Sequence, residues 1–492
     1  MSSLKQLRLL ALLASLIVLS STAYFNAGGS SNQNSRLDAI YAFVEPGNPE
    51  TFTFRIDSFM INSKRNINTI DWAHHDGHYY SNKAPGTIWM GIPVYGALIA
   101  TESLLELDWN HPLWVIANAY WINVGVSAFP VAMLAGALVF FLSALGLSAG
   151  RAFALALMVV LCTPLFPYST QIWGHPTACA FSMFALLLAH RGTPGSVALA
   201  GLCAGVATTC DYLNVIPTVG TAALVLASNR RLVGHYVLGG ALPAVALMAY
   251  HTVCFGGPLS TAAAASQAVF LDEERFLGMF GAVNPEALWQ ITFGLRRGIL
   301  LQCPLLLLTA WGFFRWYGRN ARDPLLWVCA GVASSYLLAN STFNGWHGGA
   351  TVSARYLISS MPFWLLALKE LPATRSARGL LVALGAWSAV NMLAIAAVNP
   401  LQPEKLPNPL YGTTYELFLA GHLTPFGREL RTIVYHADWP AYKIWTMFNW
   451  GQLMGLHGMT SLLPLFAMLA TLGGAAVWVL RRGEQSASPV SE

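Results

Sequence analysis

The chain has 492 residues, of which 55% are hydrophobic and only 10% are charged, with a mean hydropathy of +0.51. Soluble domains carry roughly 25% charged residues, so this composition indicates a protein of the lipid bilayer. The formal net charge of +5 comes from scattered Lys and Arg, which argues against nucleic-acid binding. None of the seven cysteines belongs to a CxxC pair, which argues against zinc sites and disulfide-stapled loops.

The first predicted element is an apolar run from Leu9 to Tyr24, which follows Lys5 and Arg8. A cleaved signal peptide is the alternative interpretation. The run is nearly long enough to span a bilayer and lacks a clean small-x-small exit, so we expect an uncleaved first membrane helix. Under either interpretation the residues after Asn26 lie on the outer side of the membrane.

The segment NQNSRLDAIYAFVE, from Asn32 to Glu45, has a helical spacing of apolar side chains. The side chains at i, i+3, i+4 and i+7 are Leu37, Ile40, Tyr41 and Val44. This spacing predicts an amphipathic helix that lies on the membrane and ends at Pro46-Gly47. Asp38 falls off the apolar stripe and can face a cavity, although a solvated position or an ion pair is the alternative.

The stretch DGHYYSNKAPG, from Asp76 to Gly86, concentrates an acid, a histidine, two tyrosines and a lysine just before another apolar run. We expect this stretch to return the chain to the membrane, where its final Pro-Gly turns it into the run from Ile88 to Leu105. Lys83 is placed to contact a phosphate, and a snorkelling interfacial lysine is the alternative. Asp76 either acts directly or only forms the Asp-Gly turn.

Further apolar runs follow, and with the first helix they predict about 12 transmembrane helices. These runs are Val115–Leu145, Ala152–Phe166, Thr177–Ala189, Ser196–Cys210, Leu213–Ala227, Tyr236–Phe255, Ile299–Phe314, Leu325–Asn340, Leu357–Leu368, Gly379–Val398 and Met459–Leu480. The predicted fold class is an all-α polytopic membrane protein that forms a single integral membrane domain, residues 1–492.

Basic residues in alternate short connections set the predicted orientation, because such connections face the cytoplasm. They are Arg151, Arg191, Arg230, Arg231, Arg315, Arg319, Arg322, Lys369, Arg375, Arg378, Arg481 and Arg482. If the run from Ile88 to Leu105 crossed the membrane, these residues would face outward, so we expect that run to lie along or dip into the outer face. Segments 26–112, 256–297 and 399–458 are then periplasmic and form the expected active-site face.

Two further outer segments carry more polar groups than an interfacial belt of aromatic residues requires. PYSTQIWGH includes Gln171 and His175. FNGWHGGATVSARY includes His347 and Arg355 among glycines that let the backbone approach a ligand closely. Arg355 either binds a phosphate or anchors the chain at the interface.

Acidic and histidine residues elsewhere are open to two interpretations. Asp211, at the outer end of a predicted span, is either a functional acid or the cap of the next helix. The acidic run 272–274 favours a helix start or a solvated turn over a metal site. His74 and His75 lie near Asp71, but no fourth ligand has suitable spacing, so we expect neither a metal nor another cofactor.

The layout resembles the GT-C superfamily of polytopic membrane glycosyltransferases, which includes protein O-mannosyltransferases and the lipid A aminoarabinose transferase. The resemblance rests on the long outer loop after the first helix, an acid soon after that helix, and a K-x-P turn before a juxtamembrane helix. The segments SR…DGHYYSNKAPG, PYSTQIWGH and GGATVSARYL are similar to those of uncharacterised bacterial members. It implies a polyprenyl-phosphate sugar donor and an acidic base in the first outer loop, which here matches Asp38.

The chain departs from the superfamily in one respect. The common pair of acids is absent, because Ala39 and Ile40 follow Asp38. This departure argues against a metal-bridged site and leaves the other acids of the first loop, Asp57, Asp71 and Asp76, as competitors for the role of base.

The chemistry of such a transfer independently calls for cations and a carboxylate. A leaving phosphate gains negative charge, so cations beside it act most strongly in the transition state. The acceptor hydroxyl must lose its proton, and we expect Asp38 or Asp76 to accept it. The candidate substrate-binding residues are Lys83, Arg355, His347, His175, Tyr80, Gln171 and Arg297.

The sequence thus predicts a hexosyl- or pentosyltransferase of the bacterial cell inner membrane with its active site facing the periplasm. It would move a sugar from a polyprenyl-phosphate donor to a hydroxyl of a glycan, lipid or protein. The alternative is a transporter or flippase of a lipid-linked substrate. Many transporters show internal repeats and broken helices near mid-membrane. This sequence shows no repeat, and its reactive groups gather on one side, which favours the enzyme.

Overall fold

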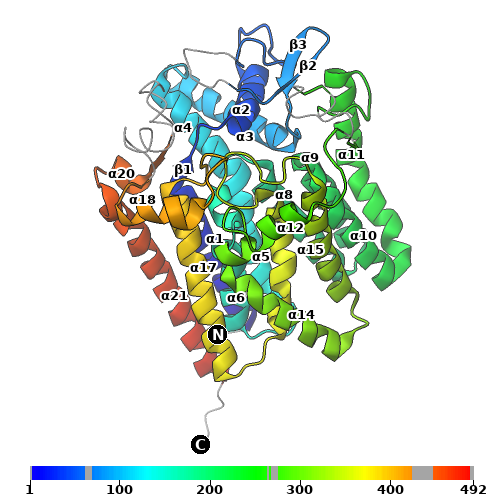
Figure 1. Ribbon diagram of the computed structural model, residues 1–492, viewed down its shortest axis with the longest axis vertical. Coiled ribbons are helices and arrows are strands. Elements are labelled where there is room, and N and C mark those ends of the chain that lie inside the picture. Colours follow the sequence, from blue (N-terminus) through cyan, green and yellow to red (C-terminus); the bar gives the residue numbers. More distant parts are fainter. Residues whose placement is uncertain are drawn as a thin grey trace, which may run out of the picture.

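The apolar runs expected from the sequence are helical in the structure, because a backbone among apolar groups must satisfy its N–H and C=O groups within its own helix. The computed structural model describes residues 3–60, 69–262, 265–266, 275–276, 278–423 and 447–487. Long helices stand side by side in one bundle (Figure 1). The predicted helical architecture is therefore confirmed. The acidic run 272–274 lies outside the described residues.

The bounds of the elements follow in chain order. The helices of the first half are α1 (Ser3–Ala23), α2 (Ser31–Val44), α3 (Gly86–Leu104), α4 (Pro112–Asn123), α5 (Phe129–Ala144), α6 (Ala149–Leu161), α7 (Leu165–Tyr168), α8 (Gly174–Arg191), α9 (Pro194–Cys210), α10 (Val215–Asn229) and α11 (Val233–Phe255). The later helices are α12 (Pro285–Thr292), α13 (Ile299–Gln302), α14 (Leu307–Asn320), α15 (Pro324–Thr342), α16 (Met361–Leu365), α17 (Arg375–Val398), α18 (Tyr415–Leu419), α20 (Trp450–Leu453) and α21 (Leu463–Ala487).

Six helical stretches in the described part of the chain are long and apolar enough to cross a membrane. They are Leu4–Ala23, Leu113–Ala144, Tyr212–Phe255, Pro324–Thr342, Arg375–Val398 and Gly458–Gly483. The stretch that ends at Phe255 contains both α10 and α11, which a short 3-10 turn joins. Two apolar helices, α6 and α9, are shorter. These stretches support a membrane-embedded protein, whereas the number 12 and the orientation stay predictions.

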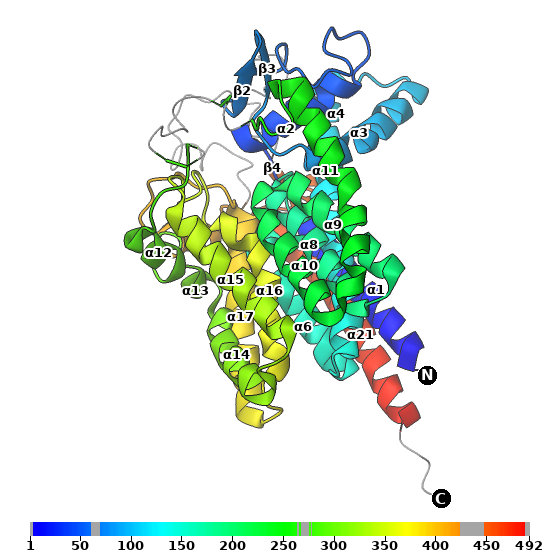
Figure 2. The same cartoon turned by 90° about the vertical axis from the view of Figure 1, so that its right-hand side faces the viewer.

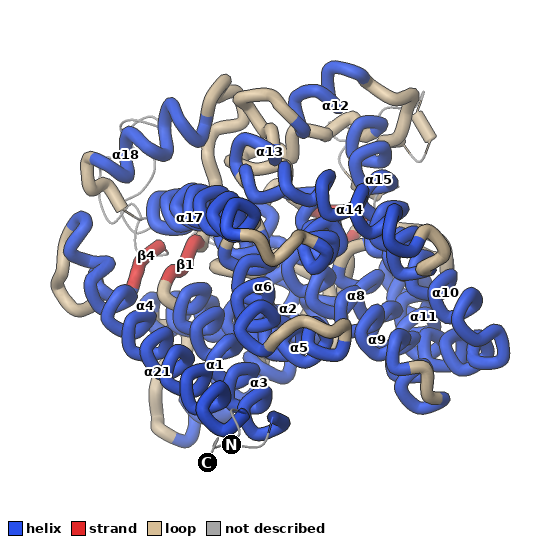
Figure 3. Tube along the Cα trace, turned by 90° about the horizontal axis from the view of Figure 1, so that it is seen from below, coloured by secondary structure: helices blue, strands red, loops and turns tan. Residues whose placement is uncertain are grey.

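The bundle has one end rich in loops and one end that carries the chain termini. Helices α2 and α3 and the hairpin of β2 and β3 lie at the first end, while α1 begins and α21 finishes at the opposite end (Figures 1 and 2). Figure 3, which looks at the bundle from the terminal end, shows α21 beside α1. We call the first end the loop-bearing end. The candidate site described below lies there.

Two short antiparallel strand pairs lie at the loop-bearing end. Strand β1 (Phe25–Ala27) follows α1 directly and pairs with β4 (Met447–Asn449), which precedes α20. Strands β2 (Trp72–His75) and β3 (His78–Ser81) form a hairpin. The pairing of β1 with β4 joins the segment that follows α1 to the segment that precedes α20.

Helix α2 confirms the predicted helix, but it is far more buried than an amphipathic surface helix. The side chain of Ser30 caps its first turn by accepting a hydrogen bond from the N–H of Gln33, at 3.1 Å. Every residue from Gln33 to Ala42 is buried, the polar ones included. The expected position on the membrane surface is wrong, because α3 and β3 pack against α2 and the protein encloses both its apolar and its polar faces.

The tip of the β2–β3 hairpin is the Asp-Gly turn that the sequence offered as an alternative for Asp76. Asp76 and Gly77 have φ values of 50° and 78°, which is the left-handed conformation that two-residue hairpins favour. Behind the tip, Asp57 accepts hydrogen bonds from the N–H of Tyr79 at 2.6 Å and from the His78 ring at 2.8 Å. Both acids therefore shape the hairpin.

Candidate functional site

Three cations from separate parts of the chain converge at the loop-bearing end. Arg36 is on α2, Lys83 lies between β3 and α3, and Arg355 begins the 3-10 segment Arg355–Ser360. Burial lowers the pKa of both Arg36 and Lys83, and the charge of Arg355 lowers both further. The structure thus brings together the two predicted phosphate contacts, Lys83 and Arg355, and adds Arg36 to them. We call these three residues the cation cluster.

Close backbone contacts at the end of α9 bring the cluster together. Gly86 is the first residue of α3, and a Cβ added to it would lie 2.7 Å from the backbone nitrogen of Cys210. On the other side, a Cβ at Gly174 would collide with the carbonyl oxygen of Cys210 and would lie 3.2 Å from the guanidinium of Arg36. Only glycine allows these approaches. The turn that carries Lys83 and the start of α8 therefore both meet the end of α9.

Specific partners hold each cation in place. Arg36 is 5% exposed; its Nε donates to Thr87 at 3.0 Å, and it also donates to the carbonyl of Asn32 at 2.9 Å. The Lys83 ammonium lies 3.1 Å from the carboxylate of Asp71. These partners fix the two charges before any ligand arrives, which is the condition for electrostatic stabilisation without reorganisation.

Arg355 lies among aromatic rings. Its guanidinium carbon is 4.5 Å from the ring centre of Trp173 and 5.0 Å from that of Tyr356, and it donates to the Tyr356 hydroxyl at 3.2 Å. Its Nε is buried and has no hydrogen-bond partner within the described part of the chain. A buried N–H group of this kind normally has an acceptor. Arg355 is therefore equipped to bind a further anion.

A histidine and an aspartate form a hydrogen-bonded pair beside the cluster. His175 is in the first turn of α8 and Asp211 follows α9; Nδ1 of His175 lies 2.7 Å from the Asp211 carboxylate. Asp211 also accepts from the N–H of Leu213 at 3.2 Å, so it caps the next turn as well. The structure therefore confirms Asp211 as the cap of the next turn, while its functional role stays a prediction.

The protonation state of this pair follows from its surroundings. Burial, together with the charges of Arg355 and Arg36, lowers the pKa of His175. Burial acts to raise the pKa of Asp211, but the hydrogen bonds from His175 and Leu213 bring it below its ordinary value. His175 is thus neutral, donates Nδ1–H to an ionised Asp211, and keeps Nε2 as a proton acceptor.

The whole group carries one excess positive charge. Three cations face two carboxylates, Asp71 and Asp211, when His175 is neutral. Burial and the neighbouring charges of Arg36 and Arg355 lower the pKa of Lys83 to about 8, although Asp71 opposes them, and burial lowers the pKa of Arg36 to about 10. A bound anion would remove this repulsion. The site is therefore built for a negatively charged group.

Of the first-loop acids considered for the role of base, Asp71 lies in this group as the partner of Lys83. Asp76 is exposed at the hairpin tip. Asp38 is on α2, fully buried, and as it follows Arg36 by two residues its side chain leaves the helix about 200° away from that of Arg36. The acids beside the cation cluster are instead Asp71 and Asp211. The catalytic role of Asp38 stays a prediction.

Other predicted substrate-binding residues are distributed around the same end. Gln171 is fully buried, and neither of its amide atoms has a hydrogen-bond partner in the described part of the chain. Tyr80 packs in an apolar cluster with Phe255, its ring centre 5.7 Å away. The structure thus places Tyr80 in a core, while Gln171 lies two residues before Trp173, which contacts Arg355.

Arg297 and His347 organise the glycine-rich loop before Arg355. Arg297 is fully buried and donates to the carbonyl of His347 at 2.7 Å and to that of Gly349 at 3.0 Å. Nδ1 of His347 accepts from the N–H of Gly349 at 3.0 Å, and burial together with nearby arginines lowers the pKa of His347. In this structure both residues hold the loop that leads to Arg355.

Sequence reasoning did not identify Arg36, Trp173 and Tyr356 as parts of the site. Arg36 belongs to a helix whose spacing indicated a surface position. Trp173 and Tyr356 have the composition of interfacial aromatics. Their positions in the sequence could have indicated them, because Trp173 lies two residues before His175 and Tyr356 follows Arg355 directly.

Comparison of the chain with protein-family models, with curated proteins and with solved structures found no match in any of the three.

The close approach at Cys210 predicts that Gly86→Ala and Gly174→Ala each destabilise the protein by about 1–3 kcal/mol, the usual cost of overpacking. The reason is that the added methyl group meets backbone atoms that cannot move independently. Thermal unfolding of the purified protein in detergent measures the effect. Gly96→Ala in α3 is the matched control, since it meets open space. Equal melting temperatures for all three variants would show that the contact at Cys210 is loose.

The lowered pKa of Lys83 predicts a pH-dependent affinity for anions. Below pH 8 the ammonium is charged and attracts an anion; as the pH rises through about 8 it loses its proton, and sulfate affinity falls by up to about tenfold per pH unit. Isothermal titration with sulfate, which stays dianionic throughout, measures this change. Lys83→Arg keeps its charge and should show no such step. An unchanged pH profile in Lys83→Arg would assign the titration to another group.

Proposed function

We propose that this protein is a membrane glycosyltransferase of the bacterial inner membrane. It moves a sugar from a polyprenyl-phosphate donor to an acceptor hydroxyl at the periplasmic face. The observation that carries the proposal is the convergence of Arg36, Lys83 and Arg355 beside the pair of His175 and Asp211. Anion-binding groups and a proton acceptor lie together there, as the reaction requires.

The cation cluster suits the phosphate of the donor. When the bond between the sugar C1 and the phosphate oxygen breaks, the phosphodiester becomes a monoester and its charge moves from one towards two. Fixed cations therefore bind the transition state more strongly than the ground state. Lys83, whose side chain is 16% exposed, and Arg355, whose Nε has no acceptor among the described residues, are the two groups best placed to bind this phosphate.

The pair of His175 and Asp211 suits the acceptor. The attacking hydroxyl loses its proton as the new bond to C1 forms, and a neutral imidazole accepts that proton at Nε2. Asp211 holds the ring in the required tautomer and stabilises the imidazolium that results, because Nδ1–H is hydrogen-bonded to its carboxylate at 2.7 Å. This assignment replaces an acid of the first loop with a histidine.

The site also contains surfaces for a sugar. The partly exposed rings of His175 and Tyr356 are 5.5 Å apart at a steep angle, whereas Trp173 is buried and contacts Arg355. Aromatic faces with nearby polar groups are typical of small-molecule sites that combine apolar contact with orientation. The sugar would thus lie between the cations and the imidazole.

The role of the cations predicts that Lys83→Met and Arg355→Met each lower turnover by about tenfold to a hundredfold, the effect of 1.5–3 kcal/mol for a charge-assisted hydrogen bond. Because both contact one phosphate, the double variant should lose less than the product of the two effects. The assay is single-turnover release of polyprenyl phosphate from a panel of synthetic polyprenyl-phosphate hexoses and pentoses.

The matched control for that series is Arg230→Met, which removes an exposed arginine from the terminal end of the bundle. If both single variants retained full activity, the phosphate site would lie elsewhere. Movement of labelled lipid across vesicles without release of polyprenyl phosphate would instead support a transporter.

The proposed base predicts that His175→Gln and Asp211→Asn reduce turnover by about a hundredfold or more while sulfate affinity persists. Gln keeps a polar group of similar size but cannot accept the proton. Asp38→Asn is the comparison: with His175 as the base, it leaves turnover within about threefold of wild type. The reverse ranking, with Asp38→Asn inactive and His175→Gln active, would return the role to the first loop.

A further inference from the structure

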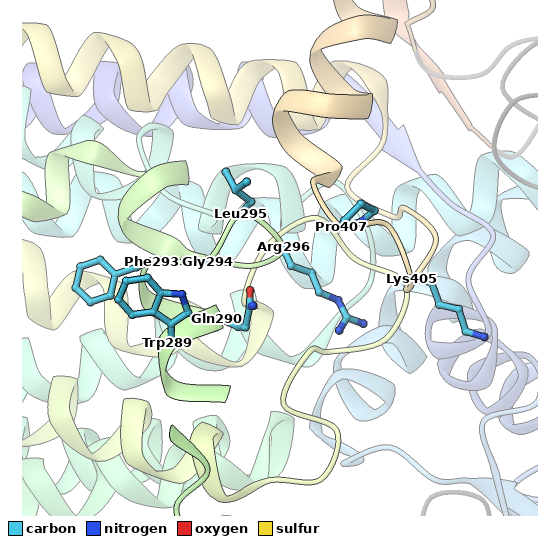
Figure 4. A pocket seen from close by; sticks show the side chains of 8 residues that line it. All are labelled: Trp289, Gln290, Phe293, Gly294, Leu295, Arg296, Lys405 and Pro407. Atoms are coloured by element: carbon cyan, nitrogen blue, oxygen red, sulfur yellow. The ribbon is translucent and has the colours of Figure 1, made fainter. Parts of the chain in front are cut away.

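A second pocket with cations and aromatic rings lies away from the cation cluster. Its cavity of about 710 Å³ is formed by the end of α12, the turn after it, and the loop before α18. The lining residues are Trp289, Gln290, Phe293, Gly294, Leu295, Arg296, Lys405 and Pro407. Two of these are cationic and none is acidic. Figure 4 shows Trp289 and Phe293 at one end, Lys405 at the other, and Arg296 between them.

The pocket lies at the level where a candidate membrane span ends. The N–H of Gly281 donates to the carbonyl of Thr342 at 2.8 Å, and that of Asn284 donates to Ser341 at 3.0 Å. These bonds tie the segment that leads into α12 to the last turn of α15, one of the six long apolar stretches. Helix α12 therefore begins at the border between the apolar bundle and the loop-bearing end.

The aromatic end of the pocket is open and apolar. Trp289, Phe293 and Leu295 are 58%, 49% and 56% exposed, and the rings of Trp289 and Phe293 lie 5.2 Å apart. Large exposed apolar side chains at the end of a span are covered by the acyl and interfacial region of a bilayer. This end of the pocket therefore suits contact with lipid.

The cationic end offers an arginine that is held in position. Arg296 donates one hydrogen bond to the carbonyl of Glu404 at 3.0 Å and lies 5.4 Å from the ring centre of Trp346. Its Nε is buried and has no hydrogen-bond partner in the described part of the chain. The Glu404 carboxylate lies 3.4 Å from His347. Arg296 and Lys405 thus leave a net positive end beside an apolar one.

We propose that this pocket binds the phosphate-bearing headgroup of an anionic membrane lipid. The phosphate would lie between Arg296 and Lys405, where the planar guanidinium can donate two parallel hydrogen bonds. The acyl chains would leave past Trp289, Phe293 and Leu295 into the bilayer. A free phosphate ion shares the polar chemistry but would gain nothing from the exposed rings, which is why a lipid is the favoured source.

Hydrogen bonds connect the pocket to the glycine-rich loop before Arg355. Arg296 and Arg297 both donate to the carbonyl of Glu404, and Arg297 also holds the carbonyls of His347 and Gly349. A headgroup at Arg296 would therefore lie one residue from the group that fixes the glycine-rich loop. The lipid site itself is independent of the proposed transferase chemistry.

The test measures lipid retention by native mass spectrometry of the full chain in detergent, titrated with phosphatidylglycerol and separately with zwitterionic phosphatidylcholine. The wild type should retain phosphatidylglycerol at least about tenfold more strongly, and R296Q/K405Q should lose this preference. R230Q/R231Q is the control, since it removes two exposed arginines elsewhere and should keep the preference. Equal retention by the wild type and R296Q/K405Q would overturn the proposal.

Two further measurements separate binding from folding and identify the source of the phosphate. Arg296→Lys keeps the charge and should retain phosphatidylglycerol, whereas a loss of folding would lower its melting temperature too. Phosphatidylglycerol with brominated acyl chains should quench tryptophan fluorescence in the wild type more than in Trp289→Phe. Displacement of the lipid by millimolar inorganic phosphate with no effect of Trp289→Phe would show a free-phosphate site and would contradict the lipid proposal.

Discussion

The close packing of backbones at the end of α9 is the contact on which the arrangement of the site depends. Gly86 and Gly174 both meet Cys210, one leading into α3 and the other starting α8. Through this contact the turn with Lys83, the first turn with His175 and the position after α9 with Asp211 come to one place. No side chain larger than hydrogen fits at either glycine. The chemistry at the loop-bearing end therefore begins with a steric constraint on the main chain.

An excess of buried positive charge costs folding free energy, and the structure compensates with rigid partners. Thr87 and Asn32 bind Arg36, Asp71 binds Lys83, and aromatic faces surround Arg355. The compensation is incomplete, as the lowered pKa of Lys83 shows. Residual strain of this kind, held in place by the fold, is typical of a site whose ligand supplies the missing charge. The same charges keep His175 neutral.

The glycine-rich loop connects two regions that are suited to negatively charged groups. Arg355 follows this loop and belongs to the cation cluster, whereas Arg297 holds the loop from the other side and is adjacent to Arg296. In the proposed picture, one region takes the phosphate of a reacting lipid and the other takes the headgroup of a membrane lipid. Both lie where apolar helices give way to loops, which is where an amphipathic substrate presents its polar group.

The sequence by itself determined where most helices form, but it determined less about which residues make up the site. The apolar runs predicted the helices, because a hydrocarbon environment leaves the backbone no other partner than itself. The sequence also indicated Lys83, Arg355 and His175 as candidates, since charged and polar groups among apolar runs require a reason. The Asp-Gly pair predicted the hairpin tip at Asp76, because these residues tolerate positive φ.

Only the tertiary structure decided which of these groups meet. Helical spacing in α2 predicted a surface helix, yet α3 and β3 enclose it and turn Arg36 into a member of the site. The helix directs Asp38 about 200° from Arg36, while Asp71, another candidate of the first loop, and Asp211 lie beside the cations; the role of Asp38 stays a prediction. Local sequence determines how each segment bends and which face is apolar. Residues more than a hundred positions apart become neighbours only through packing of whole helices, which no local pattern encodes.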